Sequence, residues 1–140
     1  IHTVHKDDRG YFKEVIRSDI KQVNQSFSKK GTIRGFHYQD PAVTKYIWVA
    51  IGKIWDVVFN LNTGEHQGRI LSAGNHEMLE IPKGYAHGFQ ALEDSVICYA
   101  MDGVYSPDED RSISPLTIEW PLKDAIISDK DRGAAPWQKV

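Results

Sequence analysis

Short runs rich in Val, Ile, Tyr, Phe and Trp alternate along this chain with Gly, Pro, Asn and Asp, a pattern that predicts β-strands. The clearest two strands are 46–51 and 53–61, and Gly52 between them predicts a tight hairpin turn. Further strands are expected at 31–38, 68–72, 77–81, 88–91 and 95–100. We therefore expect one all-β domain over residues 1–140, a small barrel or double-sheet jelly roll.

The two ends of the chain depart from this pattern. Residues 18–23 predict a helical turn, because Ser18 or Asp19 can cap it. Residues 11–15 predict a strand with no hairpin partner nearby, and an unpaired edge strand invites pairing with another chain. A two-fold homodimer is therefore expected. The tail from Pro115 onward is loop-like and carries two Trp residues that must pack against the body.

A few polar residues interrupt the apolar strands, and each can be interpreted in two ways. Asp56 lies between apolar neighbours, so it is either a paired buried carboxylate or one residue of a solvent-exposed strand face. His37 and His87 are either satisfied core histidines or site residues. Lys45 opens an apolar strand, which fits a site residue or an edge lysine equally well. A small barrel that holds one ligand would unite all four.

Charge and composition narrow the class of protein. The formal net charge is −2 at pH 7, which gives no basic surface for nucleic acid. No apolar run approaches the roughly 20 residues that cross a bilayer, so no membrane contact is expected. The one cysteine, Cys98, cannot form an internal disulfide, and a reducing cytoplasm is the simplest interpretation.

The histidines raise the question of a metal. Residues 82–87, Pro-Lys-Gly-Tyr-Ala-His, match the second motif of metal-binding cupins. The first motif needs two histidines one residue apart, and the chain has no such pair. With two plausible ligands, a catalytic metal site lacks its ligand shell. We expect no metal and, in the absence of a Gly-rich phosphate loop, no redox cofactor.

Six ordered blocks point to one family. They are DRGYFKE at 8–14, GTIRGFHYQ at 31–39, GKIWDV at 52–57, IPKGYAHGF at 81–89, YSP at 105–107 and SDKD at 128–131. Together they resemble the dTDP-4-dehydrorhamnose 3,5-epimerase family. The resemblance implies a cupin-like jelly roll, a homodimer, no metal, and a nucleoside-diphospho-4-keto-6-deoxy sugar as substrate.

The same resemblance implies roles for individual residues. His37 matches the family's base, Asp131 the carboxylate paired with it, and Tyr99 the acid. Lys45, Asp56 and His87 match residues around the sugar. Seven further residues match positions that hold the diphosphate or line the nucleotide and sugar pocket: Arg9, Arg34, Phe12, Glu14, Gln22, Asn24 and Tyr105.

These residue types suit proton transfer beside a ketone. A histidine is a natural base at neutral pH, and a cation or hydrogen-bond donor can stabilise the enolate that forms. The chain departs from the family pattern at Val43, at Ala100 and at 60–62, on the substrate side. Epimerisation at C3, at C5 or at both therefore stays open. A related 3,4-ketoisomerase and a non-catalytic sugar-binding cupin are the alternatives.

Overall fold

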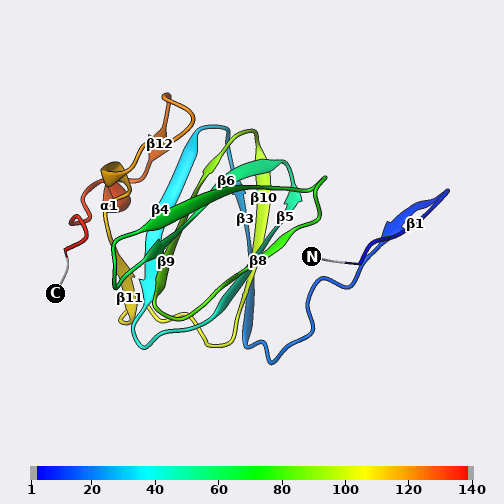
Figure 1. The fold of residues 1–140 in the computed structure, drawn as a ribbon, viewed down its shortest axis with the longest axis horizontal. Helices are drawn as coiled ribbons and strands as arrows, with labels where there is room; N and C mark the ends of the chain where they lie inside the picture. The colour runs from blue at the N-terminus through cyan, green and yellow to red at the C-terminus, as the bar shows by residue number, and fades with distance from the viewer. Residues whose placement is uncertain (1–2, 139–140) are drawn as a thin grey trace.

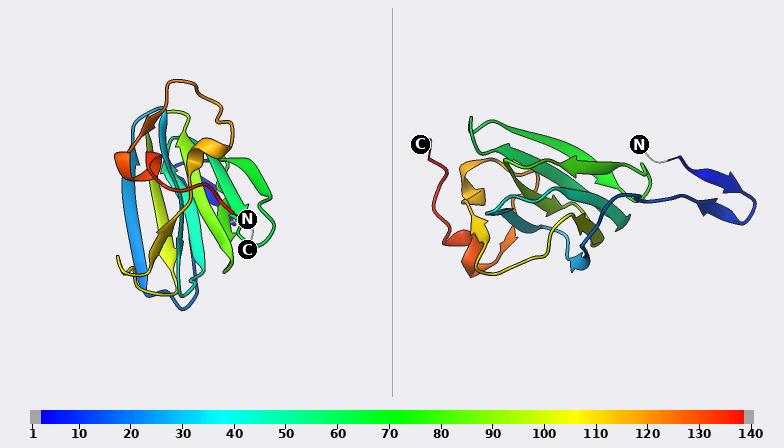
Figure 2. Two further views of the ribbon diagram at one scale, coloured as in Figure 1. Left: turned by 90° about the vertical axis from the view of Figure 1, so that its left-hand side faces the viewer. Right: turned by 90° about the horizontal axis from the view of Figure 1, so that it is seen from below.

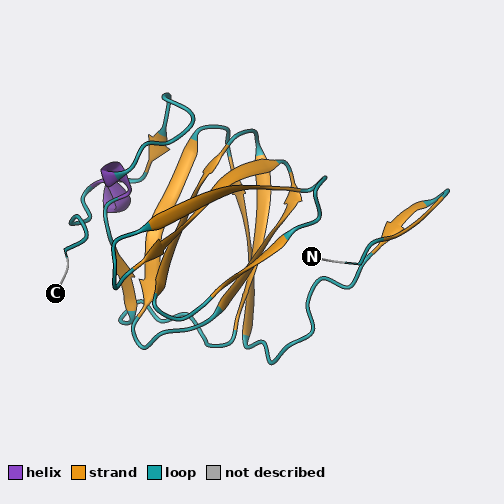
Figure 3. Cartoon of the chain, in the orientation of Figure 1, coloured by secondary structure: helices purple, strands orange, loops and turns teal. Residues whose placement is uncertain are grey.

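Two facing β-sheets make up the body of the protein, as the computed structural model of residues 3–138 shows (Figures 1 and 3). One sheet has the order β3 (Gln22–Ser28), β10 (Ser95–Met101), β5 (Lys45–Ile51) and β8 (Met78–Ile81). The other has the order β11 (Asp110–Ser112), β4 (Thr32–Gln39), β9 (Tyr85–Ala91), β6 (Lys53–Asn60) and β7 (His66–Ser72), with β12 (Ile126–Ile127) beside β4. The expected all-β jelly roll is confirmed. No helix within the described residues is long and apolar enough to span a membrane.

Both faces of the second sheet are covered, which explains why its strands are apolar on both sides. Between the sheets lies one core cluster, which consists of Ile47, Val49, Ile54, Leu71, Ile81, Phe89 and Ile97. A second cluster lies on the opposite face and consists of Ile33, Phe36, Val57, Phe59, Ala86, Ile113 and Trp120. Neighbouring residues of a strand point to opposite faces, so β6 sends Ile54 into the first cluster and Val57 into the second.

The C-terminal segment covers the outer face of that sheet. It contains a short 3-10 helix, η1 (Pro115–Thr117), and the helix α1 (Asp129–Arg132). The Trp120 indole lies 5.7 Å from the Phe36 ring, measured between centroids, and its Nε1–H donates to the Pro115 carbonyl. Trp137 Nε1–H donates to the Leu61 carbonyl at 2.9 Å. Both tryptophans therefore pack against the body, as the sequence requires.

The prediction of a hairpin at Gly52 is wrong. Strands β5 and β6 belong to different sheets, and the chain crosses from one sheet to the other at this residue. A tight hairpin needs a loop of two residues, and only Gly52 separates β5 from β6. Gly52 has a φ of +93°, and a Cβ there would lie 2.3 Å from the Ser95 Oγ, so the crossing requires glycine.

The predicted helical turn at 18–23 is also wrong. Strand β3 begins at Gln22 and pairs along its whole length with β10. Its pattern misleads because Val23 and Phe27 face outward and are more than half exposed, whereas Asn24 and Ser26 face inward. The outer face of this sheet therefore carries exposed apolar side chains.

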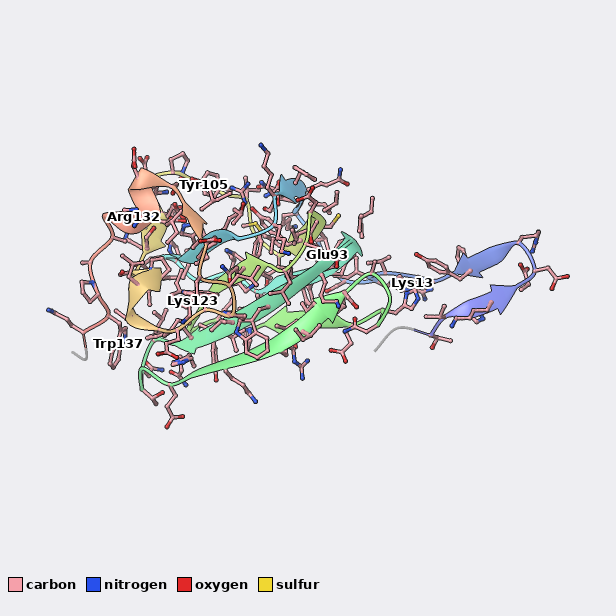
Figure 4. All side chains as sticks on the ribbon, turned by 90° about the horizontal axis from the view of Figure 1, so that it is seen from above. Lys13, Glu93, Tyr105, Lys123, Arg132 and Trp137 are labelled. Carbon is pink, nitrogen blue, oxygen red and sulfur yellow. The ribbon has the colours of Figure 1, made fainter. Side chains whose placement is uncertain are left out.

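The N-terminal residues form a hairpin that projects away from the body (Figures 1 and 2). Strand β1 (His5–Asp7) pairs with β2 (Gly10–Phe12), so the expectation of a strand without a nearby partner at 11–15 is wrong. The strand ends at Phe12, and Figure 4 shows Lys13 at the base of the hairpin. Phe12 is 70% exposed. The hairpin makes a two-stranded arm with apolar side chains in solvent.

Candidate active site

A cavity of about 290 Å³ opens between the two sheets, a size near the lower limit for small-ligand sites. It brings together six of the residues that the sequence singled out, from four strands and α1: Arg34, His37, Lys45, His87, Tyr99 and Asp131. Six further residues complete its lining: Ser26, Ile47, Ile81, Phe89, Ser128 and Lys130. Six of the predicted site residues thus line one cavity.

His37 and Asp131 form a hydrogen-bonded pair in this cavity. His37 Nε2 lies 2.7 Å from Asp131 Oδ1, and the His37 side chain is 32% exposed whereas that of Asp131 is almost fully buried. A neutral His37 that donates its Nε2 proton to the carboxylate keeps Nδ1 free of a proton. The pair therefore has the arrangement of a general base held in one tautomer.

Asp131 is held in place from two sides. Its backbone N–H bonds to Ser128 Oγ, which caps α1, and the Gly35 N–H donates to Asp131 Oδ2 at 3.2 Å. Gly35 has a φ of +142°, and a Cβ there would lie 2.6 Å from the Gly88 Cα, so only glycine permits this approach. Burial opposes ionisation of Asp131, but bonding to His37 and the Gly35 N–H outweighs it and lowers the pKa.

A second pair joins His87 on β9 to Asp56 on β6. The His87 Nε2 lies 2.7 Å from Asp56 Oδ2 and 2.9 Å from Oδ1. Asp56 has no exposed surface, which excludes the interpretation of a solvent-exposed strand face. His87 also lines the cavity, so the buried carboxylate fixes the orientation of a site histidine.

Lys45 and Tyr99 face the two histidines from the other sheet. Lys45 is on β5 and Tyr99 on β10, and the Lys45 Nζ lies 5.8 Å from the centre of the Tyr99 ring. Burial lowers the pKa of Lys45, and the negative charge of Asp110 partly offsets this effect. A cation and a phenol thus share one wall of the cavity.

Arg34 on β4 adds a further positive charge to the lining of the cavity. Its guanidinium donates to Ser28 Oγ at 2.9 Å and to the Phe27 carbonyl at 3.1 Å. Ser26, Ser128 and Lys130 were not predicted as site residues. The inward polar side of β3 was the signal for Ser26, and the block at 128–131 that contains Asp131 was the signal for the other two.

The remaining predicted residues lie outside this cavity in the single chain. Arg9 is on the arm and is paired with Asp7 at 2.6 Å. Phe12 and Glu14 line a different hollow beside the base of the arm, where Glu14 bonds to Arg17. At the start of β3, Gln22 Oε1 accepts from the Tyr105 backbone N–H and Gln22 Nε2 donates to Asn24. Figure 4 labels Tyr105 on the part of the body that lies away from the arm.

Comparison with known proteins places this geometry in a family. The family profile described as dTDP-4-dehydrorhamnose 3,5-epimerase matches residues 1–139. An enzyme of that name from Methanothermobacter thermautotrophicus is 36% identical, with 95% of this chain and 85% of the relative aligned.

Solved structures agree with the sequence match. The crystal structure of dTDP-4-dehydrorhamnose 3,5-epimerase from Sulfolobus tokodaii superposes with a TM-score of 0.92 and 42% identity, covering 96% of this chain and 86% of that one. A 3,5-epimerase from Legionella pneumophila in complex with dTDP-4-keto-L-rhamnose gives a TM-score of 0.90 and 31% identity, covering 97% and 85%. The chain therefore belongs to the dTDP-4-dehydrorhamnose 3,5-epimerase family, a family of isomerases with this cupin-like fold.

Proposed function

We propose that this protein epimerises a dTDP-linked 4-keto-6-deoxy sugar at C3 and C5, with His37 as the base and Tyr99 as the acid. One observation carries the proposal. His37 on β4 and Tyr99 on β10 line one cavity from opposite sheets. Inversion of a carbon requires that a proton leave from one face and return to the other. A base and an acid on opposite walls of one cavity satisfy that requirement.

The first step removes a proton from the carbon beside the ketone. His37 takes this proton on the ring nitrogen that Asp131 does not bond, and the carboxylate stabilises the imidazolium that forms. The electrons move onto the C4 oxygen as an enolate. Lys45 lines the same cavity, and its positive charge stabilises the enolate.

The second step returns a proton to the opposite face. The Tyr99 phenol is the group on that wall that can donate it, and its ring lies beside the Lys45 ammonium. Base and acid are then restored by proton exchange with solvent.

Charge at the edge of the cavity supports a diphosphate there. The Arg34 guanidinium can bond two phosphate oxygens at once, and Lys130 lines the same cavity. The Legionella relative holds a dTDP-linked keto sugar. We extend the same ligand class to this chain.

The decisive experiment follows hydrogen exchange in D₂O by NMR, with a dTDP-linked 4-keto-6-deoxy sugar as substrate. His37→Ala should abolish deuterium incorporation, because no proton leaves without the base. Tyr99→Phe should still exchange at the carbon that His37 reaches, but inversion should fall by about 10²- to 10⁴-fold, as expected for loss of a general acid. Wild-type exchange by His37→Ala would refute the assigned base.

The same experiment separates the alternatives. Deuterium at both C3 and C5 supports double epimerisation, whereas deuterium at one centre identifies a single-centre epimerase. Migration of the carbonyl to C3 identifies a 3,4-ketoisomerase. Binding without exchange identifies a sugar-binding cupin.

We also propose that the protein acts as a homodimer in which the arm of one chain completes the cavity of the other. The arm leaves Tyr11 and Phe12 largely exposed, and the outer face of the sheet that contains β3 leaves Val23, Phe27 and Ile51 exposed. Exposed apolar groups of this number indicate a covered interface. A second copy would also bring Arg9, Phe12 and Glu14 to a site that they do not reach in their own chain.

Mixing two inactive variants tests the shared site. A His37→Ala chain keeps an intact arm, but its own cavity lacks the base. An Arg9→Ala/Phe12→Ala chain keeps an intact cavity, but its arm lacks the two side chains that would complete the neighbour's cavity. Activity should reappear when the two are mixed, since one cavity of the mixed dimer has every part. A monomer by light scattering at micromolar concentration that is fully active would contradict the proposal.

A further inference from the structure

The arm is a two-stranded hairpin whose residues in β1 and β2 are all exposed. A hairpin of two strands is at best marginally stable in water on its own. How firmly the arm is held therefore depends on what it touches where it meets the body, the junction at which Figure 4 labels Lys13. Tyr11 and Lys13 both contact one residue of the body there, His76, in the turn that joins β7 to β8.

The contact between Lys13 and His76 is a hydrogen bond that a single proton can break. The Lys13 Nζ lies 2.9 Å from the His76 Nδ1. An ammonium group only donates, so His76 Nδ1 must accept, which requires an imidazole with no proton on that nitrogen. The Tyr11 ring packs edge to face on the same imidazole, with the ring centres 4.8 Å apart. A proton on Nδ1 removes the acceptor and sets two positive charges against each other at this contact.

The shape of the turn depends on Asn75 rather than on His76. Asn75 Oδ1 accepts from the backbone N–H groups of Ser72 and Glu77. His76 itself has a φ of +54°, a left-handed conformation that glycine adopts without steric cost. What a histidine adds at this position is its ring, which lies partly buried against the arm.

The charged groups around His76 oppose its protonation. Lys13 lies against the ring, and Lys6 on β1 adds a second positive charge from the same face of the hairpin. Glu77, the next residue in the chain, is paired with Arg69 at 3.7 Å. Partial burial and the two lysines lower the pKa of His76. The imidazole therefore gains its charge only below the ordinary histidine value of about 6.5.

We propose that the contact between Lys13 and His76 is a latch that holds the arm against the body while His76 is neutral and releases the arm when acid protonates His76. The consequence for catalysis rests on the proposed function. If the arm completes the cavity of a second chain, its release withdraws Arg9 and Phe12 from that cavity. The latch then makes substrate binding sensitive to acid through a residue that lies outside the cavity.

Hydrogen–deuterium exchange of the 140-residue chain, read by mass spectrometry at about pH 7.5 and about pH 5.0, tests the latch. Each rate is divided by the intrinsic rate of the amide at the same pH. Amides of β1 and β2 should lose protection several-fold at the lower pH, whereas amides of β9 in the core should stay protected. Equal loss in both regions would show that acid loosens the whole fold and would overturn the proposal.

Two substitutions should remove the acid response for different reasons. His76→Gln supplies an amide oxygen that accepts from Lys13 and does not titrate, so the arm should stay protected at both pH values. Lys13→Met removes the donor and the like charge, so protection of the arm should be low already at neutral pH and change little with acid. His5→Gln is the matched control, because alternation places His5 on the other face of the hairpin from Tyr11, and it should respond as the wild type does.

An acid response that survives in His76→Gln, or that His5→Gln abolishes, would contradict the latch. A kinetic readout separates the latch from the proposed function. The KM of the wild type should rise on acidification more than that of His76→Gln, whereas kcat should change alike in both, because their base and acid are the same. Release of the arm with no difference in KM would refute the shared cavity and leave the latch in place. An inactive wild type would refute the proposed function, and the exchange result would still decide the latch.

Discussion

Two histidine–aspartate pairs lie side by side in this molecule and differ in how they are built. His37 and His87 are directly opposite each other on β4 and β9, and each Nε2 lies 2.7 Å from a carboxylate oxygen. Asp56 comes from the next strand of the same sheet and is fully buried. Asp131 comes from α1, outside the sheet, and leaves the His37 side chain 32% exposed.

The difference indicates different tasks. Register places Val58 opposite His87, so Asp56 is its diagonal neighbour on the same face, and the pair is fixed by the sheet itself. His37 has an orienting partner but keeps an open side toward the cavity. We infer that the open pair, His37–Asp131, moves a proton, whereas the rigid pair, His87–Asp56, holds the second histidine of the cavity in one orientation.

The largest effect on activity is expected from a substitution that breaks the open pair. Asp131→Asn replaces an acceptor-only carboxylate by an amide, which can donate to His37 Nε2 and so favour the tautomer with its proton on Nδ1. The base would then lose its lone pair toward the substrate. Exchange of substrate hydrogen in D₂O should fall by about 10²- to 10⁴-fold in protein that is still folded at the assay temperature. An exchange rate near wild type would show that Asp131 does not set the tautomer.

A substitution that breaks the rigid pair should have the second largest effect, a lower free energy of unfolding. Asp56→Ala leaves the His87 imidazole, which is only 11% exposed, without its partner, and removal of one member of a buried pair costs about 3–5 kcal/mol. Urea unfolding followed by tryptophan fluorescence measures this. Asp131→Ala is the matched control and should cost less, because His37 can reach solvent. Equal losses would erase the distinction between the pairs.

The sequence predicts the two pairs to different extents. Alternation along 53–61 placed Asp56 mid-strand, which left a paired buried carboxylate and a solvent-exposed strand face both open and named no partner for Asp56. Nothing in the alternation relates residue 131 to residue 37, because their contact depends on how the tail crosses the outer face. The family resemblance supplied that pairing, and the 2.7 Å contact is consistent with it.

The failed strand predictions have a similar cause. Strand periodicity shows which residues share a face, but it does not show which sheet a strand joins, so β5 and β6 looked like a hairpin. Strand β3 was missed because its apolar residues face outward and its polar residues face the cavity. Such an inverted pattern arises where a protein binds a polar ligand inside and covers an apolar surface outside.

A smaller effect is expected on the free energy of unfolding at acid pH. The pKa of Asp131 is lower in the folded chain than in the unfolded one, so its contribution to stability is present above the unfolded pKa of about 3.9 and disappears as pH falls through the folded value. The free-energy difference between wild type and Asp131→Asn should therefore be largest near neutral pH and shrink below about pH 4. Urea unfolding at pH 7 and at about pH 2.5, below the unfolded pKa, measures it. A difference that stays constant would show that the carboxylate contributes no pH-dependent stability.

The smallest expected effect is that of metal removal. Two histidines opposite each other on neighbouring strands could suggest a metal site, but each already directs Nε2 at a carboxylate, and the chain lacks the His-x-His pair of metal-binding cupins. Prolonged treatment with EDTA should leave the exchange rate unchanged, and purified protein should contain no stoichiometric transition metal by mass spectrometry. The two pairs would then act only through protons and hydrogen bonds. If EDTA abolished exchange and a divalent ion restored it, the two histidines would be ligands of one ion, and the separate tasks assigned to them here would be wrong.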